Sequence, residues 1–193
     1  MTGAAEAFLF GAVLGFSLAV PPGPMNAWIA VVASRSYRAG VITGLGAMTA
    51  DAVLGVAVYL LDRSVDLHPA VRFVYLLGAG VMGFLGARLL APAGPDGASP
   101  SDDRTFVRAL LIGLSNPFQV VWWLTAGVAF AYLGGVILLV GLFAAIVVWI
   151  VSFPWAVRAG ARRRPSFERA VRYASAGILL AFAAYFVVLF SLG

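Results

Sequence analysis

The sequence predicts an all-α integral membrane protein with six transmembrane helices, arranged as two inverted three-helix repeats whose first and fourth helices are broken. Hydrophobic residues make up 62% of the 193 residues and charged residues only 11%, whereas soluble domains carry about 25% charged residues. Six segments are apolar over roughly the 20 residues that a helix needs to cross a bilayer. Prolines interrupt the first segment of each half of the chain.

The residue types that are scarce exclude several classes of function. The chain has no cysteine, which excludes disulfides, thiolate metal sites and thiol redox chemistry. The single histidine, His68, lies in a predicted loop, which weakens the case for an imidazole metal cluster. We therefore expect no metal and no cofactor. No basic region precedes the first apolar segment, so the N-terminus does not resemble a cleavable signal peptide.

The six predicted spans divide into two groups of three. We place them at residues 6–30, 40–61, 70–90, 105–128, 134–157 and 172–192. A hydrophilic linker rich in Pro, Gly, Ser and Asp covers residues 91–104, so the first repeat is 1–90 and the second is 105–193. The fourth and fifth spans share one charge-free run, which we divide at the paired glycines of residues 132–135.

The arginines predict the orientation of the chain. The net charge of +5 comes from thirteen arginines and no lysine. With six spans, all of them except Arg63 and Arg72 fall on one side, and basic residues mark the cytoplasmic face. We therefore interpret the charge as a topological signal and not as a nucleic-acid surface, and expect both termini outside the cell membrane. The lipid bilayer is the expected partner. Because a small six-span chain offers little wall around a cavity, a homodimer is a further expected arrangement.

An odd number of spans in each half means that the second half enters the membrane from the opposite face. If the two halves share a fold, they form an inverted repeat, as in many secondary transporters. Short matches favour this plan: residues 70–73 (AVRF) resemble 170–173 (AVRY), and 40–42 and 135–137 both read GVI.

The strongest correspondence lies in the interrupted spans. Aligning Pro24 with Pro117 places a side-chain amide two residues later in each half, Asn26 in the first and Gln119 in the second. Gly/Pro-interrupted segments at corresponding positions of two halves point to a transport site. These two amides either line the cavity or bond free backbone.

The Pro22-Gly23-Pro24 motif predicts a helix that ends near Val20 and a second helix that starts near Pro24. Prolines lack the N–H that a continuous helix needs, and proline suits the first position of a new helix. Pro117 should act in the same way in the fourth span.

Asn116 or Ser115 should cap the new helix in the fourth span. The N-terminus of a half-helix presents free N–H groups that suit a carboxylate. The half-helix that ends there presents carbonyls that suit an ammonium group, so the breaks fit a zwitterion.

Asp51 is an acidic residue near the centre of the second predicted span. A charge at the bilayer centre costs roughly 2.5–3.5 kcal/mol on insertion scales, so the side chain should face the protein interior. Asp51 could pair with a substrate ammonium group or carry a proton that drives export, and both roles stay open. A purely structural role, with Asp51 bonded to a neighbouring helix, is the other interpretation. The Trp122-Trp123 pair could close a cavity or anchor the span at the membrane interface.

The chain resembles the LysE/RhtB family of amino-acid exporters over essentially its whole length. The residues that carry the resemblance are Pro22-Gly23-Pro24, Ala50-Asp51 and Asn116-Pro117, together with the chain length and the hydrophilic middle loop. Met25 stands where the family usually has a polar residue, and Pro21 precedes the motif as an additional proline.

The resemblance and the paired breaks together predict a secondary transporter, and not an enzyme. It would export an amino acid or similar small zwitterion, coupled to an ion gradient such as that of protons. The expected binding residues are Asp51, Asn26, Asn116 and Gln119. The alternative is a metal or organic cation exporter of a related superfamily, although a metal site generally needs His, Cys or several carboxylates.

Overall fold

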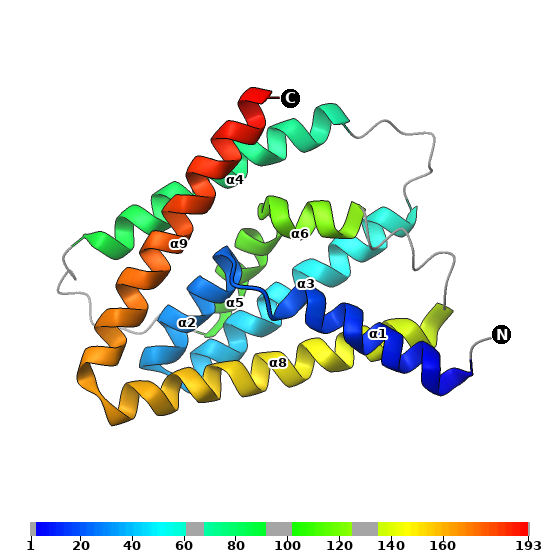
Figure 1. Ribbon diagram of the computed structural model, residues 1–193, viewed down its shortest axis with the longest axis horizontal. Helices are drawn as coiled ribbons and strands as arrows, with labels where there is room; N and C mark the ends of the chain where they lie inside the picture. Colours follow the sequence, from blue (N-terminus) through cyan, green and yellow to red (C-terminus); the bar gives the residue numbers. More distant parts are fainter. Residues whose placement is uncertain (1–2, 61–67, 92–101, 125–134, 193) are drawn as a thin grey trace.

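The computed structural model of the chain is all-helical in the residues that it describes, which are 3–60, 68–91, 102–124 and 135–192 (Figure 1). The helices are α1 (Ala4–Ala19), α2 (Pro24–Arg35), α3 (Tyr37–Leu60), α4 (His68–Leu90), α5 (Asp102–Leu114), α6 (Pro117–Trp122), α8 (Gly135–Arg163) and α9 (Pro165–Leu192).

Four of these helices, α3, α4, α8 and α9, are long and apolar enough to cross a membrane. The pair α1 and α2 qualifies as a fifth span that is bent by 77°. The prediction of six spans is thus confirmed for four or five of them within the described residues. The predicted fourth span begins as α5 and α6, and its remainder lies outside the described residues, as does most of the linker 91–104.

The first span breaks where the sequence predicts. Helix α1 ends at Ala19, and α2 begins with Pro24 at its first position after an extended Gly23. Pro21 and Pro22 occupy the connecting segment and supply no N–H groups that could extend α1. Because the break falls inside an apolar run, it holds irregular backbone at the depth of the membrane, where backbone must be buried in protein or line a cavity.

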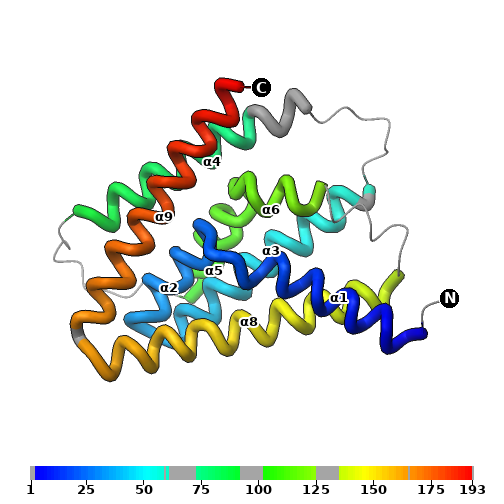
Figure 2. The backbone as a smooth tube through the Cα atoms, viewed as in Figure 1, coloured from blue at the N-terminus to red at the C-terminus, as the bar shows by residue number. Residues whose placement is uncertain are grey.

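The helices pack in pairs around α2. Helix α1 lies along α8, α3 along α5, and α4 along α9, while α2 contacts α3, α8 and α9 (Figures 1 and 2). The α1–α8 contact is close because Gly11 and Gly15 lie against the backbone of Leu138 and Leu142. Small residues commonly permit such close approach between helices in membranes.

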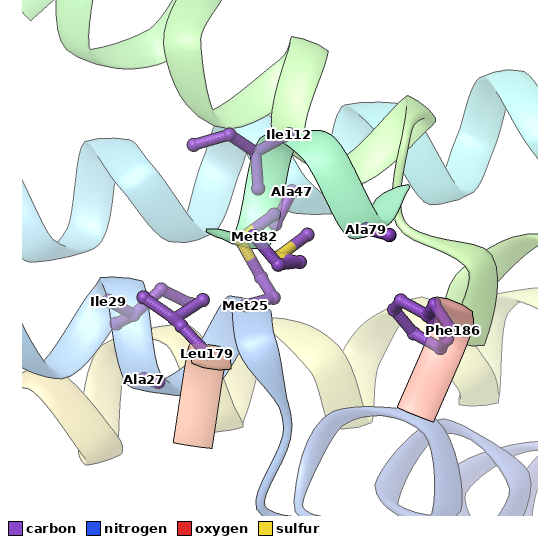
Figure 3. Packing of buried hydrophobic residues seen from close by; sticks show 9 residues of the cluster. All are labelled: Met25, Ala27, Ile29, Ala47, Ala79, Met82, Ile112, Leu179 and Phe186. Carbon is purple, nitrogen blue, oxygen red and sulfur yellow. The ribbon is translucent and has the colours of Figure 1, made fainter. Parts of the chain in front are cut away.

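The buried core gathers where α2 meets its neighbours. Met25 and Ile29 of α2 pack with Met82 of α4 and Leu179 of α9, and Met82 and Leu179 are fully buried (Figure 3). The outer surface is also apolar, with Phe73 68% exposed. An exposed apolar surface of this extent suits contact with lipid and not with water.

The start of α8 agrees with the predicted glycine turn. Gly135 has a φ of +58°, in the left-handed region that glycine adopts most easily. The other residues of that predicted turn, 132–134, lie outside the described residues.

Candidate functional site

The two helix breaks border one cavity. Its lining includes Pro22, Gly23 and Pro24 from the first break and Asn116 from the second. The cavity measures about 60 Å³, which is room for a few water molecules. The sequence placed these breaks 93 residues apart (24 and 117), and the fold brings both to one space.

Asp51 lines this cavity from α3 and is only 5% exposed. Its Oδ1 atom accepts hydrogen bonds from Gln119 Nε2 at 2.9 Å and from Trp123 Nε1 at 3.1 Å. Among the described residues, both donors contact this same oxygen and neither contacts Oδ2. Asp51 therefore faces the protein interior, as the cost of exposing a carboxylate to lipid requires.

Asn116 caps α6 and also holds Gln119 in place. Its Oδ1 accepts from the Phe118 N–H at 3.2 Å, which is an N-cap contact, and its Nδ2 donates to Gln119 Oε1 at 3.1 Å. The sequence offered Asn116 or Ser115 as the cap, and the cap is Asn116. A continuous chain of hydrogen bonds thus runs from the second break through Gln119 to Asp51.

Asn26 braces the first break. Its Nδ2 donates to the Ala19 carbonyl at 2.6 Å and to the Pro21 carbonyl at 2.9 Å, and its Oδ1 accepts from Trp149 Nε1 at 3.1 Å. The sequence left two uses open for this amide, and in the structure it has both, because it bonds free backbone and also lines the cavity. The carbonyls of Ala19 and Pro21 are groups that a continuous helix would have satisfied.

Two tryptophans contact residues of the site; Trp149 was not singled out from sequence, and Trp123 was left between closing a cavity and anchoring the span. Trp123 is 3% exposed and bonds Asp51, so the interfacial-anchor interpretation does not describe this residue. Trp149 stacks on Phe153 with ring centroids 4.9 Å apart. Trp149 lies on the same face of α8 as Ile146 and Ile150, which also line the cavity, and that helical spacing is the one signal by which it could have been found.

Pro117 is buried but is not part of the cavity lining. Its ring lies against Gly78 of α4, where an added Cβ would overlap it. Pro117 therefore contributes to the site by starting α6 and by packing it onto α4.

The rest of the wall is apolar. Met48 from α3, Ile146 and Ile150 from α8, and Phe182 from α9 close the cavity around the single carboxylate. Within the described part of the chain, no three His, Cys, Asp or Glu side chains gather in a way that could hold a metal ion.

Residues 16–189 match the family model described as LysE type translocator. The chain belongs to the LysE-type translocator family. A curated relative is the "putative amino acid efflux protein YcgF" of Bacillus subtilis (strain 168), which is 32% identical over 93% of this chain and 94% of the relative. No solved structure matches the chain significantly.

Membership of this family makes the chain a multi-pass membrane transporter and not an enzyme. In this LysE-type translocator, the matched region contains both helix breaks and the Asp51 cavity. Of the residues that carried the resemblance in the sequence, Pro22, Gly23, Pro24, Asp51 and Asn116 line this cavity, whereas Ala50 packs near Gly113 and Pro117 packs near Gly78.

Proposed function

We propose that this LysE-type translocator is a secondary transporter that exports an amino acid or a similar small zwitterion across the cytoplasmic membrane. The observation that carries the proposal is a buried carboxylate, Asp51, in a cavity bordered by two broken helices. The name of the Bacillus subtilis relative, "putative amino acid efflux protein YcgF", supports the substrate class.

The substrate ammonium group pairs with Oδ2 of Asp51. The substrate carboxylate binds at the N-terminus of α2, where no side chain caps the helix and where Met25 and Asn26 line the cavity. The N–H groups of the first turn of a helix have no partner within the helix, and they carry partial positive charge. The N-terminus of α6 is the poorer choice because Asn116 already accepts from the Phe118 N–H there.

Export is coupled to a proton gradient through the same carboxylate. Asp51 holds either a proton or the substrate ammonium group, because a proton on Oδ2, the oxygen that Gln119 and Trp123 do not contact, removes the negative charge that attracts the ammonium group. Binding of one cation then displaces the other, which exchanges protons for substrate. Gln119, Asn116 and Asn26 position the groups that bind and do not themselves contact the ammonium.

The two halves, residues 1–90 and 105–193, form an inverted repeat joined by the linker 91–104. The helix pairs support this arrangement, because exchanging the halves turns α1–α8 into α5–α3 and α2–α9 into α6–α4. The pair α4–α9 is converted into itself. Within the described residues, the contacts of α2 with α3 and α8 have no counterpart of similar extent at α6, so the support comes from the pairs named above.

Single residues support the same symmetry. Gly46 follows Gly40 at the same spacing as Gly141 follows Gly135, and each packs on a backbone carbonyl of the opposite half, those of Phe106 and Phe8.

Aligning residues 70–73 (AVRF) with 170–173 (AVRY) makes Gly83 of α4 equivalent to Ala183 of α9. A Cβ added at Gly83 would lie 3.8 Å from the Ala183 Cβ, as expected where a two-fold axis passes between α4 and α9.

Both termini lie outside, and the arginine-rich ends face the cytoplasm. Two ion pairs support this topology, Arg35–Glu168 at 3.0 Å and Arg38–Asp102 at 2.5 Å. Arg35 and Arg38 follow the first predicted span, Asp102 follows the third, and Glu168 follows the fifth. Residues that pair with one another must lie on the same side of the membrane. In the six-span topology these three loops do lie on one side, because an even number of spans separates each from the next.

The test of the proposal is efflux from proteoliposomes that are preloaded with a mixture of amino acids. The purified protein should release one or a few amino acids faster than empty liposomes, and an imposed proton gradient should accelerate that release. Equal leakage of every amino acid with and without protein would refute the export function. Divalent metal and organic cations, loaded in parallel, test the alternative substrates.

A further inference from the structure

A second hollow lies on the surface at the C-terminal end of α8, apart from the transport cavity. Its volume is about 340 Å³, and it is lined by Tyr37 of α3 and by five residues of α8. These five are Trp155, Arg158, Ala159, Arg162 and Arg163. Their spacing of three and four residues places them on one face of the helix. The three arginines among them therefore lie side by side along α8.

We propose that this hollow binds the headgroup of an anionic phospholipid of the surrounding bilayer. Three arginines in one concavity attract a phosphate and can bond it with two parallel N–H groups each. Within the part of the chain that the structure describes, none of the three pairs with a carboxylate. By contrast, the nearby Arg35 and Arg38 do have carboxylate partners.

The Arg158 side chain is held in place within the hollow by a hydrogen bond. Its Nη1 donates to the carbonyl of the buried Ser34 at 2.6 Å, and the side chain is half-buried. The remaining N–H groups of this guanidinium can bond a phosphate without ordering the side chain anew. The C-terminal carbonyls of α8 carry roughly half a negative charge, which three full positive charges outweigh.

The position of the hollow suits a lipid better than a soluble phosphate. The exposed apolar side chains of Val148, Val151 and Trp155 continue the same face of α8 toward the membrane interior, and Trp155 is 66% exposed. Aromatic residues such as Trp155 and Tyr37 are typical of the headgroup level. A phospholipid would place its phosphate at the arginines and its acyl chains along this apolar stripe.

Trp155 provides a direct readout of lipid at the hollow. The full-length protein is reconstituted in phosphatidylcholine vesicles that contain an equal minor fraction of brominated phosphatidylglycerol or of brominated phosphatidylcholine. Bromine quenches tryptophan fluorescence at short range. The quenching that disappears in Trp155→Phe isolates the signal of this residue from those of the other tryptophans.

We expect brominated phosphatidylglycerol to quench Trp155 more strongly than brominated phosphatidylcholine. Replacing Arg162 and Arg163 with glutamine should lower the relative affinity for the anionic lipid by about fivefold per arginine. The matched control is the pair Arg104→Gln and Arg108→Gln, which removes two exposed arginines of α5 outside the hollow and should leave the preference unchanged.

Three outcomes would overturn the proposal. Equal quenching by both lipids would mean that the hollow has no preference for an anionic headgroup. An equal loss of preference in both arginine pairs would mean that only the general surface charge acts. Displacement of the brominated lipid by soluble glycerol 3-phosphate would make the hollow a phosphate site. Unchanged elution and helicity of each variant show that it is folded.

Discussion

Replacing Gln119 with leucine tests the hydrogen-bond chain that connects the second helix break to Asp51. Leucine has a similar volume but neither donates to Asp51 nor accepts from Asn116. Loss of a hydrogen bond to a charged group costs about 2 kcal/mol, and leaving the buried Asn116 amide without its partner costs about 1 kcal/mol more. We therefore expect Gln119→Leu to lower the free energy of unfolding by about 3 kcal/mol.

The hydrogen bond between Asn116 and Gln119 leads to a second expectation, for the double variant. Asn116→Ala removes the cap of α6 and the bond to Gln119, at a cost of about 2 kcal/mol. In the double variant Asn116→Ala/Gln119→Leu, the Asn116 amide is absent, so the cost of leaving it without a partner does not arise. The two costs should therefore fall short of additivity by about 1 kcal/mol or more.

The assay is reversible unfolding of the purified protein by SDS titration in mixed micelles, followed by circular dichroism. Ser191→Ala serves as the control, because its exposed hydroxyl only bonds the Val187 carbonyl of its own helix, and surface changes of this kind stay within about 0.5 kcal/mol. Strict additivity of the Asn116 and Gln119 costs would refute the connected chain.

Further expectations concern helix packing and the first break. Gly141→Ala should destabilise the protein by about 1–3 kcal/mol, because the added Cβ overlaps the Phe8 carbonyl. Gly177→Ala, which meets nothing within 4 Å, is its control, and equal costs in the same unfolding assay would contradict the close α1–α8 contact. Trp149→Phe keeps an aromatic ring but removes the donor to Asn26, so it should cost about 1 kcal/mol and slow efflux; an unchanged efflux rate would remove Trp149 from the site.

The helix breaks could be predicted from sequence because their cause is local. Pro22 and Pro24 cannot donate within a helix wherever they occur, and Pro117 imposes the same limit in the fourth span. Asp51 was found because a carboxyl group in an apolar run must be used or hidden. These residues can be recognised from the local sequence alone, without knowing which residues contact them in the fold.

The partners of these residues could not be predicted, because they depend on contacts between distant segments. Trp149 lies 123 residues from the Asn26 that it bonds, and Trp123 lies 72 residues from Asp51. In sequence, Trp149 looks like any aromatic residue of an apolar span, and the Trp122-Trp123 pair left two uses open. The hydrogen bond from Asn26 to the Ala19 carbonyl likewise depends on where that carbonyl comes to lie.

The most direct test of the central claim, that Asp51 binds the substrate ammonium group and the proton in turn, is efflux by the Asp51→Asn variant. Asparagine keeps an oxygen that can accept from Gln119 and Trp123 but cannot neutralise an ammonium group or exchange a proton. We predict that this variant inserts and folds as the native protein does, yet releases the substrate from proteoliposomes no faster than empty vesicles, with or without a proton gradient. Native rates of proton-driven efflux in Asp51→Asn would contradict the account, because the buried carboxylate would then serve only to join helices.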